Sequence, residues 1–142
     1  IWSKAELPSN SPKKAYANAE IEGVRNKVEF KTGNILSMPF PNNFFEVVTS
    51  SSVINNFHSE LDKFKAFREI RRVLKPGGRF LMLEPLRDSW EGIVIFSPFF
   101  AWMILPKGKW IEYLEKADFI NLKFGKLNSM GAFLVEKPSS AA

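Results

Sequence analysis

The string Lys75-Pro76-Gly77-Gly78 is the strongest local constraint on the fold, because no helix continues through it. Upstream, Ser59 is suited to cap a helix N-terminus, with Asp62 three residues on in a variant of the capping box. Downstream, Arg79–Glu84 is a nearly all-apolar run, a pattern typical of a strand covered on both faces. The sequence therefore predicts a helix that ends sharply and leads directly into a buried strand.

The helix that begins after Ser59 is predicted to be amphipathic. Its apolar side chains recur every three or four residues and predict a stripe facing the core, made of Leu61, Phe64, Phe67, Ile70 and Leu74. The opposite face carries side chains that we expect in solvent, namely Lys63, Lys65, Arg68, Arg71 and Arg72.

Helix and strand signals alternate along the rest of the chain. Helices are predicted at Pro12–Glu22, where Ser11 caps and Pro12 begins the helix, and from Trp110 to Ala117. Strands are predicted at Lys27–Thr32, Phe44–Thr49, Asn121–Leu127 and Ala132–Lys137, the last two forming a hairpin. This alternation favours the α/β class, with a mostly parallel sheet and an antiparallel C-terminal hairpin.

The composition is that of a globular domain, with 45% hydrophobic and 25% charged residues among 142. The lack of cysteine excludes a disulfide framework and thiolate metal sites, and the single histidine, His58, excludes a site that needs two imidazoles from one chain. The net charge of +5 is scattered, so no nucleic-acid tail is predicted. No basic segment followed by an apolar one is visible at the start, so we expect a cytoplasmic protein. From the content of cysteine and histidine we expect no metal site.

The most apolar stretch is Ile93–Leu105, which Ser97-Pro98 interrupt. It is shorter than the roughly 20 apolar residues that cross a bilayer. Three interpretations remain open: a buried segment, a lid over a hydrophobic substrate, or a surface that touches a membrane through Phe99, Phe100 and Trp102.

Two strings resemble the S-adenosylmethionine-dependent methyltransferases with a Rossmann-like fold, and most closely their type 11 subgroup. Gly33–Val48, reading GNILSMPFPNNFFEVV, is similar to the family pattern G-D-x-x-x-L-P-F-P-D-x-S-F-D-x-V. Arg68–Phe80, reading REIRRVLKPGGRF, is similar to R-E-x-x-R-V-L-K-P-G-G-R. The resemblance implies a sheet of strand order 3-2-1-4-5-7-6, S-adenosylmethionine as cofactor and a small-molecule substrate.

The resemblance also implies the site residues. Asn34 stands where the family has an acidic residue that accepts a hydrogen bond from the adenine amine, and its amide oxygen can still accept. Ile35 would line the adenine, and Ser50 and Ser51 would lie beside the methionine part of the cofactor. The positions expected to contact cofactor are therefore Ile1, Trp2, Gly33, Asn34, Ile35, Ser50 and Ser51.

His58 and Asn55 are the catalytic candidates, His58 as a general base and Asn55 as a polar group within reach of substrate. Surface exposure just before a helix is the competing interpretation of His58. Catalysis in this family depends largely on positioning, because the sulfonium methyl is already activated.

The glycine-rich loop and the ribose-binding acid of the family are missing, and Ile1 aligns just after that acid. Residues 1–138 are therefore expected to be the C-terminal portion of a methyltransferase domain that lacks its first two strands, and residues 139–142 a disordered tail. The missing strands would leave a hole of roughly 14 Å, at about 4.8 Å per strand, between Lys27–Thr32 and Phe44–Thr49. Three outcomes are open: a fragment, a rearranged sheet in which these two strands pair, or a homodimer that covers the exposed edges.

Two functions follow from this resemblance. The first is methyl transfer from S-adenosylmethionine to a small, hydrophobic molecule, with residues 90–106 forming part of the substrate pocket or its lid. The alternative is a non-catalytic, methyltransferase-like interaction module that has lost cofactor binding.

Overall fold

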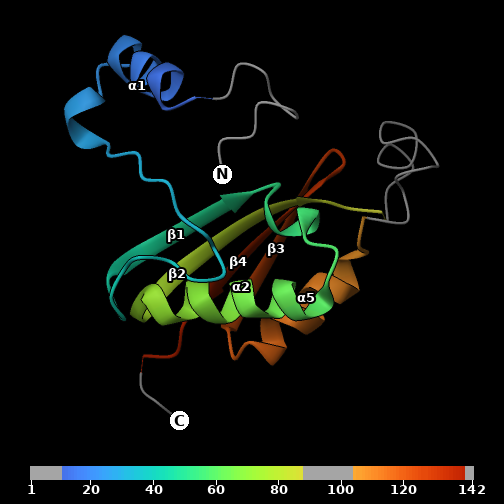
Figure 1. Ribbon diagram of the computed structural model, residues 1–142. Coiled ribbons are helices and arrows are strands. Elements are labelled where there is room, and N and C mark those ends of the chain that lie inside the picture. The colour runs from blue at the N-terminus through green and yellow to red at the C-terminus, as the bar shows by residue number, and fades with distance from the viewer. Residues whose placement is uncertain (1–10, 88–103, 140–142) are drawn as a thin grey trace. The chain divides into compact units, whose positions relative to one another are not determined.

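The computed structural model describes residues 11–87 and 104–139 (Figure 1). The chain divides into two compact units, Ile1–Asn34 and Ile35–Ala142.

The first unit contains the helix α1, Pro12–Ile21, and the short 3-10 helix η1, Arg25–Lys27. As the sequence predicts, Ser11 caps α1, its Oγ accepting a hydrogen bond from the Lys14 backbone N–H at 3.3 Å. Tyr16 organises the rest of this unit. Its ring contacts Phe30 edge-on with centroids 4.7 Å apart, and the Arg25 guanidinium lies 3.9 Å from its centroid.

The predicted strand Lys27–Thr32 is wrong. Lys27 ends η1, and the residues from Val28 to Thr32 have no regular structure. The Phe30 backbone N–H donates to the Tyr16 hydroxyl at 3.4 Å rather than to a neighbouring strand. Alternating side chains suit a strand only where a partner supplies the ladder of hydrogen bonds, and the sheet does not include this segment. The rearranged sheet, in which it pairs with the next strand, is therefore also wrong.

The second unit is built on a four-stranded sheet of order β1-β2-β4-β3. The strands are β1, Phe45–Ser51; β2, Leu74–Pro85; β3, Ile120–Leu127; and β4, Met130–Glu136. β1 and β2 are parallel, whereas β4 is antiparallel to both β2 and β3. This arrangement matches the 4-5-7-6 part of the expected strand order and confirms the C-terminal hairpin.

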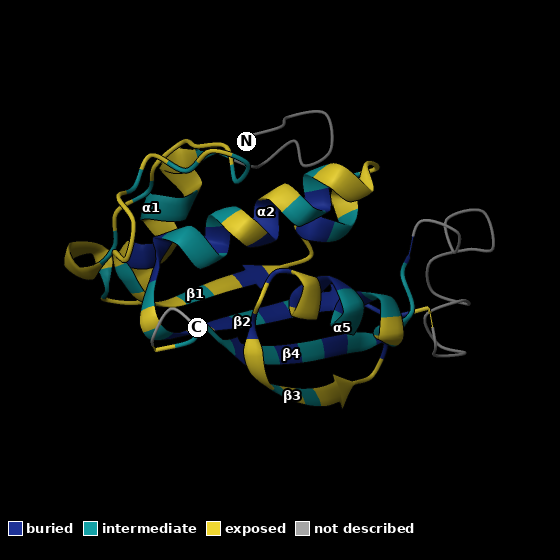
Figure 2. Ribbon diagram, turned by 90° about the horizontal axis from the view of Figure 1, so that it is seen from below, coloured by how far each residue is buried: buried dark blue, intermediate teal, exposed yellow. Residues whose placement is uncertain are grey.

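Two helices, α2 (Glu60–Val73) and α5 (Lys107–Lys116), cover one face of the sheet (Figures 1 and 2). The core between them is aromatic: the Phe67 ring of α2 lies 6.2 Å from that of Phe80 and 6.4 Å from that of Trp110, centroid to centroid. Along β2, Phe80 and Met82 are fully buried, whereas Leu81 and Leu83 on the other face are only half-buried. The two faces of β2 are therefore unequally buried, whereas the sequence predicted that both would be covered.

The helix α2 ends at Val73 and β2 begins at Leu74, so Lys75–Gly78 forms the start of β2 rather than a separate connection. Gly77 has φ +74°, in the left-handed region that favours glycine. Gly78 is required for close approach, because a Cβ there would lie 2.8 Å from the Lys75 carbonyl oxygen and 3.1 Å from that of Glu46. These two glycines let β2 start immediately beside β1.

Two side chains of α2 lie on the opposite side from the one predicted. Leu61, in the first turn, is 61% exposed and does not join the core. Lys63 is 5% exposed, because its ammonium group donates to the Phe57 carbonyl oxygen in the loop before the helix. Buried lysines are tolerated only where they are hydrogen-bonded, which helical periodicity alone does not reveal.

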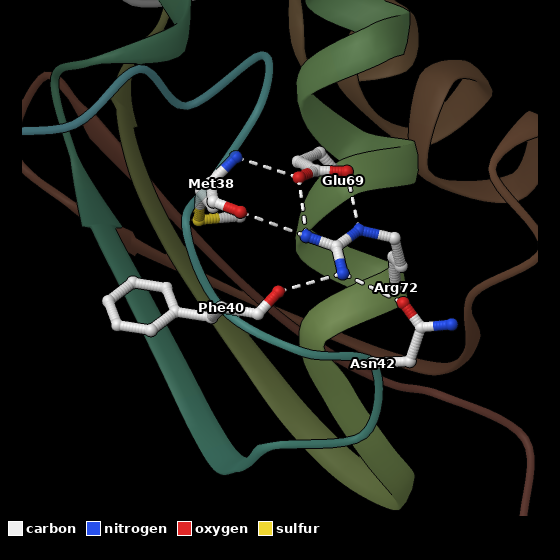
Figure 3. A network of polar contacts seen from close by, with 5 residues as sticks. All are labelled: Met38, Phe40, Asn42, Glu69 and Arg72. Carbon is white, nitrogen blue, oxygen red and sulfur yellow. Dashed lines mark hydrogen bonds and ion pairs between the residues drawn. The ribbon is translucent and has the colours of Figure 1, made fainter.

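Arg72 was also expected in solvent, but it clamps the connection that leads into β1 (Figure 3). Its guanidinium donates to the carbonyl oxygens of Phe40 at 2.9 Å and Met38 at 3.1 Å, and to Asn42 Oδ1 at 2.7 Å. Glu69 completes the network: it pairs with Arg72 at 2.6 Å and accepts the Met38 N–H at 2.7 Å. The hydrogen bond from Arg72 lowers the pKa of Glu69. The family-like Arg-Glu-x-x-Arg string thus supplies a structural clamp.

Candidate functional site

The carboxyl ends of β1 and β2 lie side by side. Ser50 is paired in register with Met82, and Ser51 with Leu83. The Ser52 N–H then donates to the Leu83 carbonyl oxygen at 2.8 Å, so hydrogen bonding to β2 continues past the last residue of β1. In open α/β sheets, ligands bind outside the carboxyl ends of parallel strands, and this edge is therefore the candidate site.

Glu84 fixes the loop that follows β1. It lies two residues after Met82 on the core-facing side of β2 and is fully buried. Its Oε1 accepts the backbone N–H groups of Ile54 at 2.8 Å and Val53 at 3.2 Å. Burial raises the pKa of Glu84 to about 7, although these hydrogen bonds and the charge of Lys63 act to lower it.

Lys63 holds the same loop from the other side, through its hydrogen bond to the Phe57 carbonyl oxygen. Burial lowers the pKa of Lys63, whereas the charges of Glu60 and Glu84 act to raise it. The loop between β1 and α2 is therefore held at its start by a buried acid and at its end by a buried base.

Three buried polar atoms at this edge have no hydrogen-bond partner in the described structure: Ser50 Oγ, Asn55 Oδ1 and Glu84 Oε2. An unpaired buried polar atom costs about 1–3 kcal/mol. A polar ligand or bound water at the ends of β1 and β2 would remove this cost.

The structure brings together four of the residues predicted for the site. Ser50 is buried and Ser51 exposed at the end of β1, Asn55 is half-buried in the 3-10 helix η2 (Ile54–Asn56), and His58 is exposed shortly before α2. All four lie within nine consecutive residues: Ser50 and Ser51 end β1, and Asn55 and His58 lie on the loop that Glu84 and Lys63 hold.

The other predicted cofactor residues are placed less fully. Gly33 and Asn34 are exposed at the end of the first unit, and Ile35 begins the second unit, packed against its core. Ile1 and Trp2 lie outside the described residues, as do Phe99, Phe100, Trp102 and most of residues 90–106. Ile104, which follows that gap, is buried.

Sequence reasoning missed Glu84 and Lys63. For Glu84 a signal was present: the alternation of a strand places it on the same face as Phe80 and Met82, so its charge ends an otherwise apolar row. For Lys63 no local signal distinguished it from the exposed lysines of the same helix.

The hollow of about 700 Å³ in the second unit does not coincide with this polar edge. It opens at the amino ends of β1 and β2 instead, where Asn43 precedes β1 and Lys137 follows the antiparallel β4. The burial and hydrogen-bonding pattern, rather than the hollow, therefore locates the candidate site.

Residues 8–82 match a family described as a methyltransferase domain. This match covers more than half of the chain and includes β1, the Glu69–Arg72 clamp and most of β2. The chain belongs to this methyltransferase family. The family expected from the two sequence strings is thereby confirmed.

The relatives of this methyltransferase domain include quinone-modifying enzymes. The ubiquinone/menaquinone biosynthesis C-methyltransferase UbiE of Psychromonas ingrahamii is 38% identical over 85 residues, which are 60% of this chain and 33% of that protein. The UbiE of Vibrio cholerae is 39% identical over 85 residues, 60% of this chain and 32% of that protein. The chain thus spans about a third of the length of these relatives.

Solved structures share the fold of this methyltransferase domain. A putative O-methyltransferase of Nostoc punctiforme superposes with a TM-score of 0.76 at 15% identity, covering 91% of this chain and 42% of that chain. Human N-acetylserotonin methyltransferase, solved in complex with S-adenosylmethionine, gives a TM-score of 0.66 at 18% identity, covering 80% and 34%. The predicted Rossmann-like methyltransferase fold is confirmed. Among the described residues, no helix has the length and apolar character to cross a membrane.

Proposed function

We propose that this chain is part of an S-adenosylmethionine-dependent methyltransferase that acts on a small, hydrophobic molecule, with residues 1–138 as the C-terminal portion of its domain. One observation carries the proposal: the family match runs through β1 and β2, at whose carboxyl ends buried polar atoms lack partners. A polar cofactor at this edge would supply those partners.

The residues present fit a part of the cofactor. Ser50 and Ser51 would contact its amino-acid portion, and the unpaired Ser50 Oγ supports this role. Asn34 and Ile35, with Gly33, Ile1 and Trp2, would hold the adenosine portion. S-adenosylmethionine supplies an activated methyl group, so this chain's own residues have to bind, orient and exclude water.

The substrate we propose is a quinol-like aromatic ring that is methylated on carbon. The similarity to the two UbiE proteins supports this class, and the apolar stretch Ile93–Leu105 provides the side chains for a hydrophobic pocket or lid. A ring carbon that gains a methyl group gives up a proton, and the exposed imidazole of His58 is our candidate acceptor, with Asn55 orienting the ring.

Calorimetric titration of the 142-residue chain with S-adenosylmethionine tests the cofactor. A dissociation constant in the micromolar range supports the proposal. No heat at millimolar cofactor would overturn it for this chain and favour the alternative, an interaction module without cofactor.

Acceptor specificity is tested by incubating the protein and cofactor with a prenylated hydroquinone, a catechol and a primary amine. Methyl addition to a ring carbon of the hydroquinone, located by NMR, supports carbon methylation. Addition to the catechol oxygen or the amine nitrogen alone would exclude the quinol-like substrate but retain the methyltransferase.

The cytoplasmic location, the homodimer and the peripheral membrane contact stay predictions. Flotation with liposomes tests the contact through Phe99, Phe100 and Trp102, and sedimentation tests the homodimer.

A further inference from the structure

A basic groove of about 700 Å³ lies at the amino edge of the sheet, opposite the candidate methyltransferase site. Its lining residues all belong to the second unit and come from α2, from the end of α5 and the turn after it, and from the chain before β1 and after β4. Two acidic residues, Glu69 and Asp118, face six basic ones: Lys65, Arg68, Arg71, Arg72, Lys116 and Lys137.

Half of this positive charge is already neutralised. The three cations with a carboxylate partner are Arg72 with Glu69, Lys65 with Asp62 and Lys116 with Glu112. The remaining three, Arg68, Arg71 and Lys137, form no ion pair in the part of the chain that the structure describes. The lining therefore keeps a positive excess even after Asp118 is counted.

Arg71 and Lys137 both line this groove, and both keep an unusual environment. The Nε of Arg71 is buried and has no hydrogen-bond partner. The Lys137 ammonium group donates only to neutral acceptors, Asn43 Oδ1 and the Leu74 carbonyl oxygen, both at 2.7 Å. Burial, followed by the charge of Arg71, lowers the pKa of Lys137. Two positive charges thus line the groove without a counter-ion.

A simpler explanation is that Arg71 complements the dipole at the carboxyl end of α2, as cations in a last helical turn do. The dipole accounts for a positive charge at position 71. It does not account for a buried Nε left without an acceptor, nor for a second cation from the far end of the chain beside it.

We propose that this groove binds a phosphate group through Arg71 and Lys137, with Arg68 adding charge at its mouth. A guanidinium matches the oxygens of phosphate in geometry, and an ammonium adds a point charge. A dianion bound by the solvent-accessible part of the Arg71 guanidinium and by Lys137 would relieve the repulsion between the two cations. The groove is separate from the carboxyl-end site, so its ligand is distinct from the methyl donor and acceptor.

Calorimetric titration of the full chain with inorganic pyrophosphate at low ionic strength tests the proposal. Arg71→Met is expected to weaken binding at least about tenfold, as loss of a charge-assisted hydrogen bond does. Lys126→Met is the matched control: it removes the same charge from an exposed position on β3 that does not line the groove. Equal losses in both variants, or no binding by the wild-type chain, would overturn the proposal.

Arg68→Met keeps the test decisive if Arg71→Met fails to fold, because Arg68 is exposed on α2. It is expected to weaken pyrophosphate binding several-fold at an unchanged melting temperature, and unchanged binding would count against the groove. The source of the phosphate is then found by flotation with vesicles that contain phosphatidic acid. Flotation that requires Arg71 identifies a lipid headgroup, and its absence alongside pyrophosphate binding identifies a free phosphate compound.

Discussion

The carboxylate of Glu84, at the end of β2, accepts the backbone N–H of Ile54 at 2.8 Å, 30 residues earlier in the chain. This bond connects a buried strand to the loop that carries Asn55 and His58. The position of the candidate catalytic side chains therefore depends on a residue that takes no part in the proposed chemistry.

Glu84→Gln should change how stability depends on pH. Because the folded pKa, about 7, lies above the ordinary value of 4.5, the folded state binds more protons than the unfolded state between these values. The contribution of Glu84 to stability is therefore full below about pH 4.5 and falls as pH rises to about 7, by about 3 kcal/mol.

Denaturant unfolding of wild type and Glu84→Gln at pH 5 and pH 8 measures this effect. Taking the difference between the two proteins cancels the other carboxylates. We expect the glutamine variant to gain stability relative to wild type at pH 8. A constant difference at both pH values would contradict a raised pKa at Glu84.

Arg72→Met should destabilise the fold by about 2–4 kcal/mol, because it leaves two carbonyl oxygens and the partly buried Glu69 carboxylate without their donor (Figure 3). Lys65→Met on the same helix is the control. Its ion pair with Asp62 is exposed and 3.8 Å long, so its loss should cost under about 1 kcal/mol. Urea unfolding compares the two, and similar losses would rule out the clamp.

Gly78→Ala should cost about 1–3 kcal/mol, because a Cβ there meets the backbone oxygens of Lys75 in β2 and Glu46 in β1, which the paired strands hold in place. Gly108→Ala, in the first turn of α5, has nothing within 4 Å of the added Cβ and should stabilise the protein by up to about 1 kcal/mol. Thermal melting of both variants checks these opposite signs. A neutral Gly78→Ala would disprove the close approach.

Ser50→Ala should weaken cofactor binding without lowering the stability of the fold. Removing an unpaired buried hydroxyl leaves the free energy of unfolding unchanged or slightly raised, whereas the affinity for S-adenosylmethionine should fall about tenfold. Thr49→Val, on the exposed face of β1, should alter neither. Calorimetry together with melting curves measures both quantities, and unchanged affinity in Ser50→Ala would remove Ser50 from the cofactor site.

Much of the second unit was predictable, because its signals are local. Ser59 caps α2, Lys75–Gly78 follows just after its end, and Asn128-Ser129 turn the hairpin, each through backbone preferences of the residues themselves. The two family-like strings placed Ser50 and Ser51 at a strand end beside Asn55 and His58. These predictions required only neighbours in the sequence, or a pattern already tied to a fold.

Tertiary structure alone decided which charged side chains are buried and whether Lys27–Thr32 forms a strand. Lys63 and Glu84 form hydrogen bonds with backbone groups of the loop between β1 and α2, which lets them be buried. Arg72 leaves the solvent because a loop about 30 residues away offers it acceptors. Lys27–Thr32 has the alternation of a strand but no neighbour to pair with. The sequence by itself determined the caps of α1 and α2 and the turn of the hairpin, since short-range backbone preferences govern these. Which polar groups are buried, and therefore hold the candidate site, depends on partners that only the folded chain brings within hydrogen-bond distance.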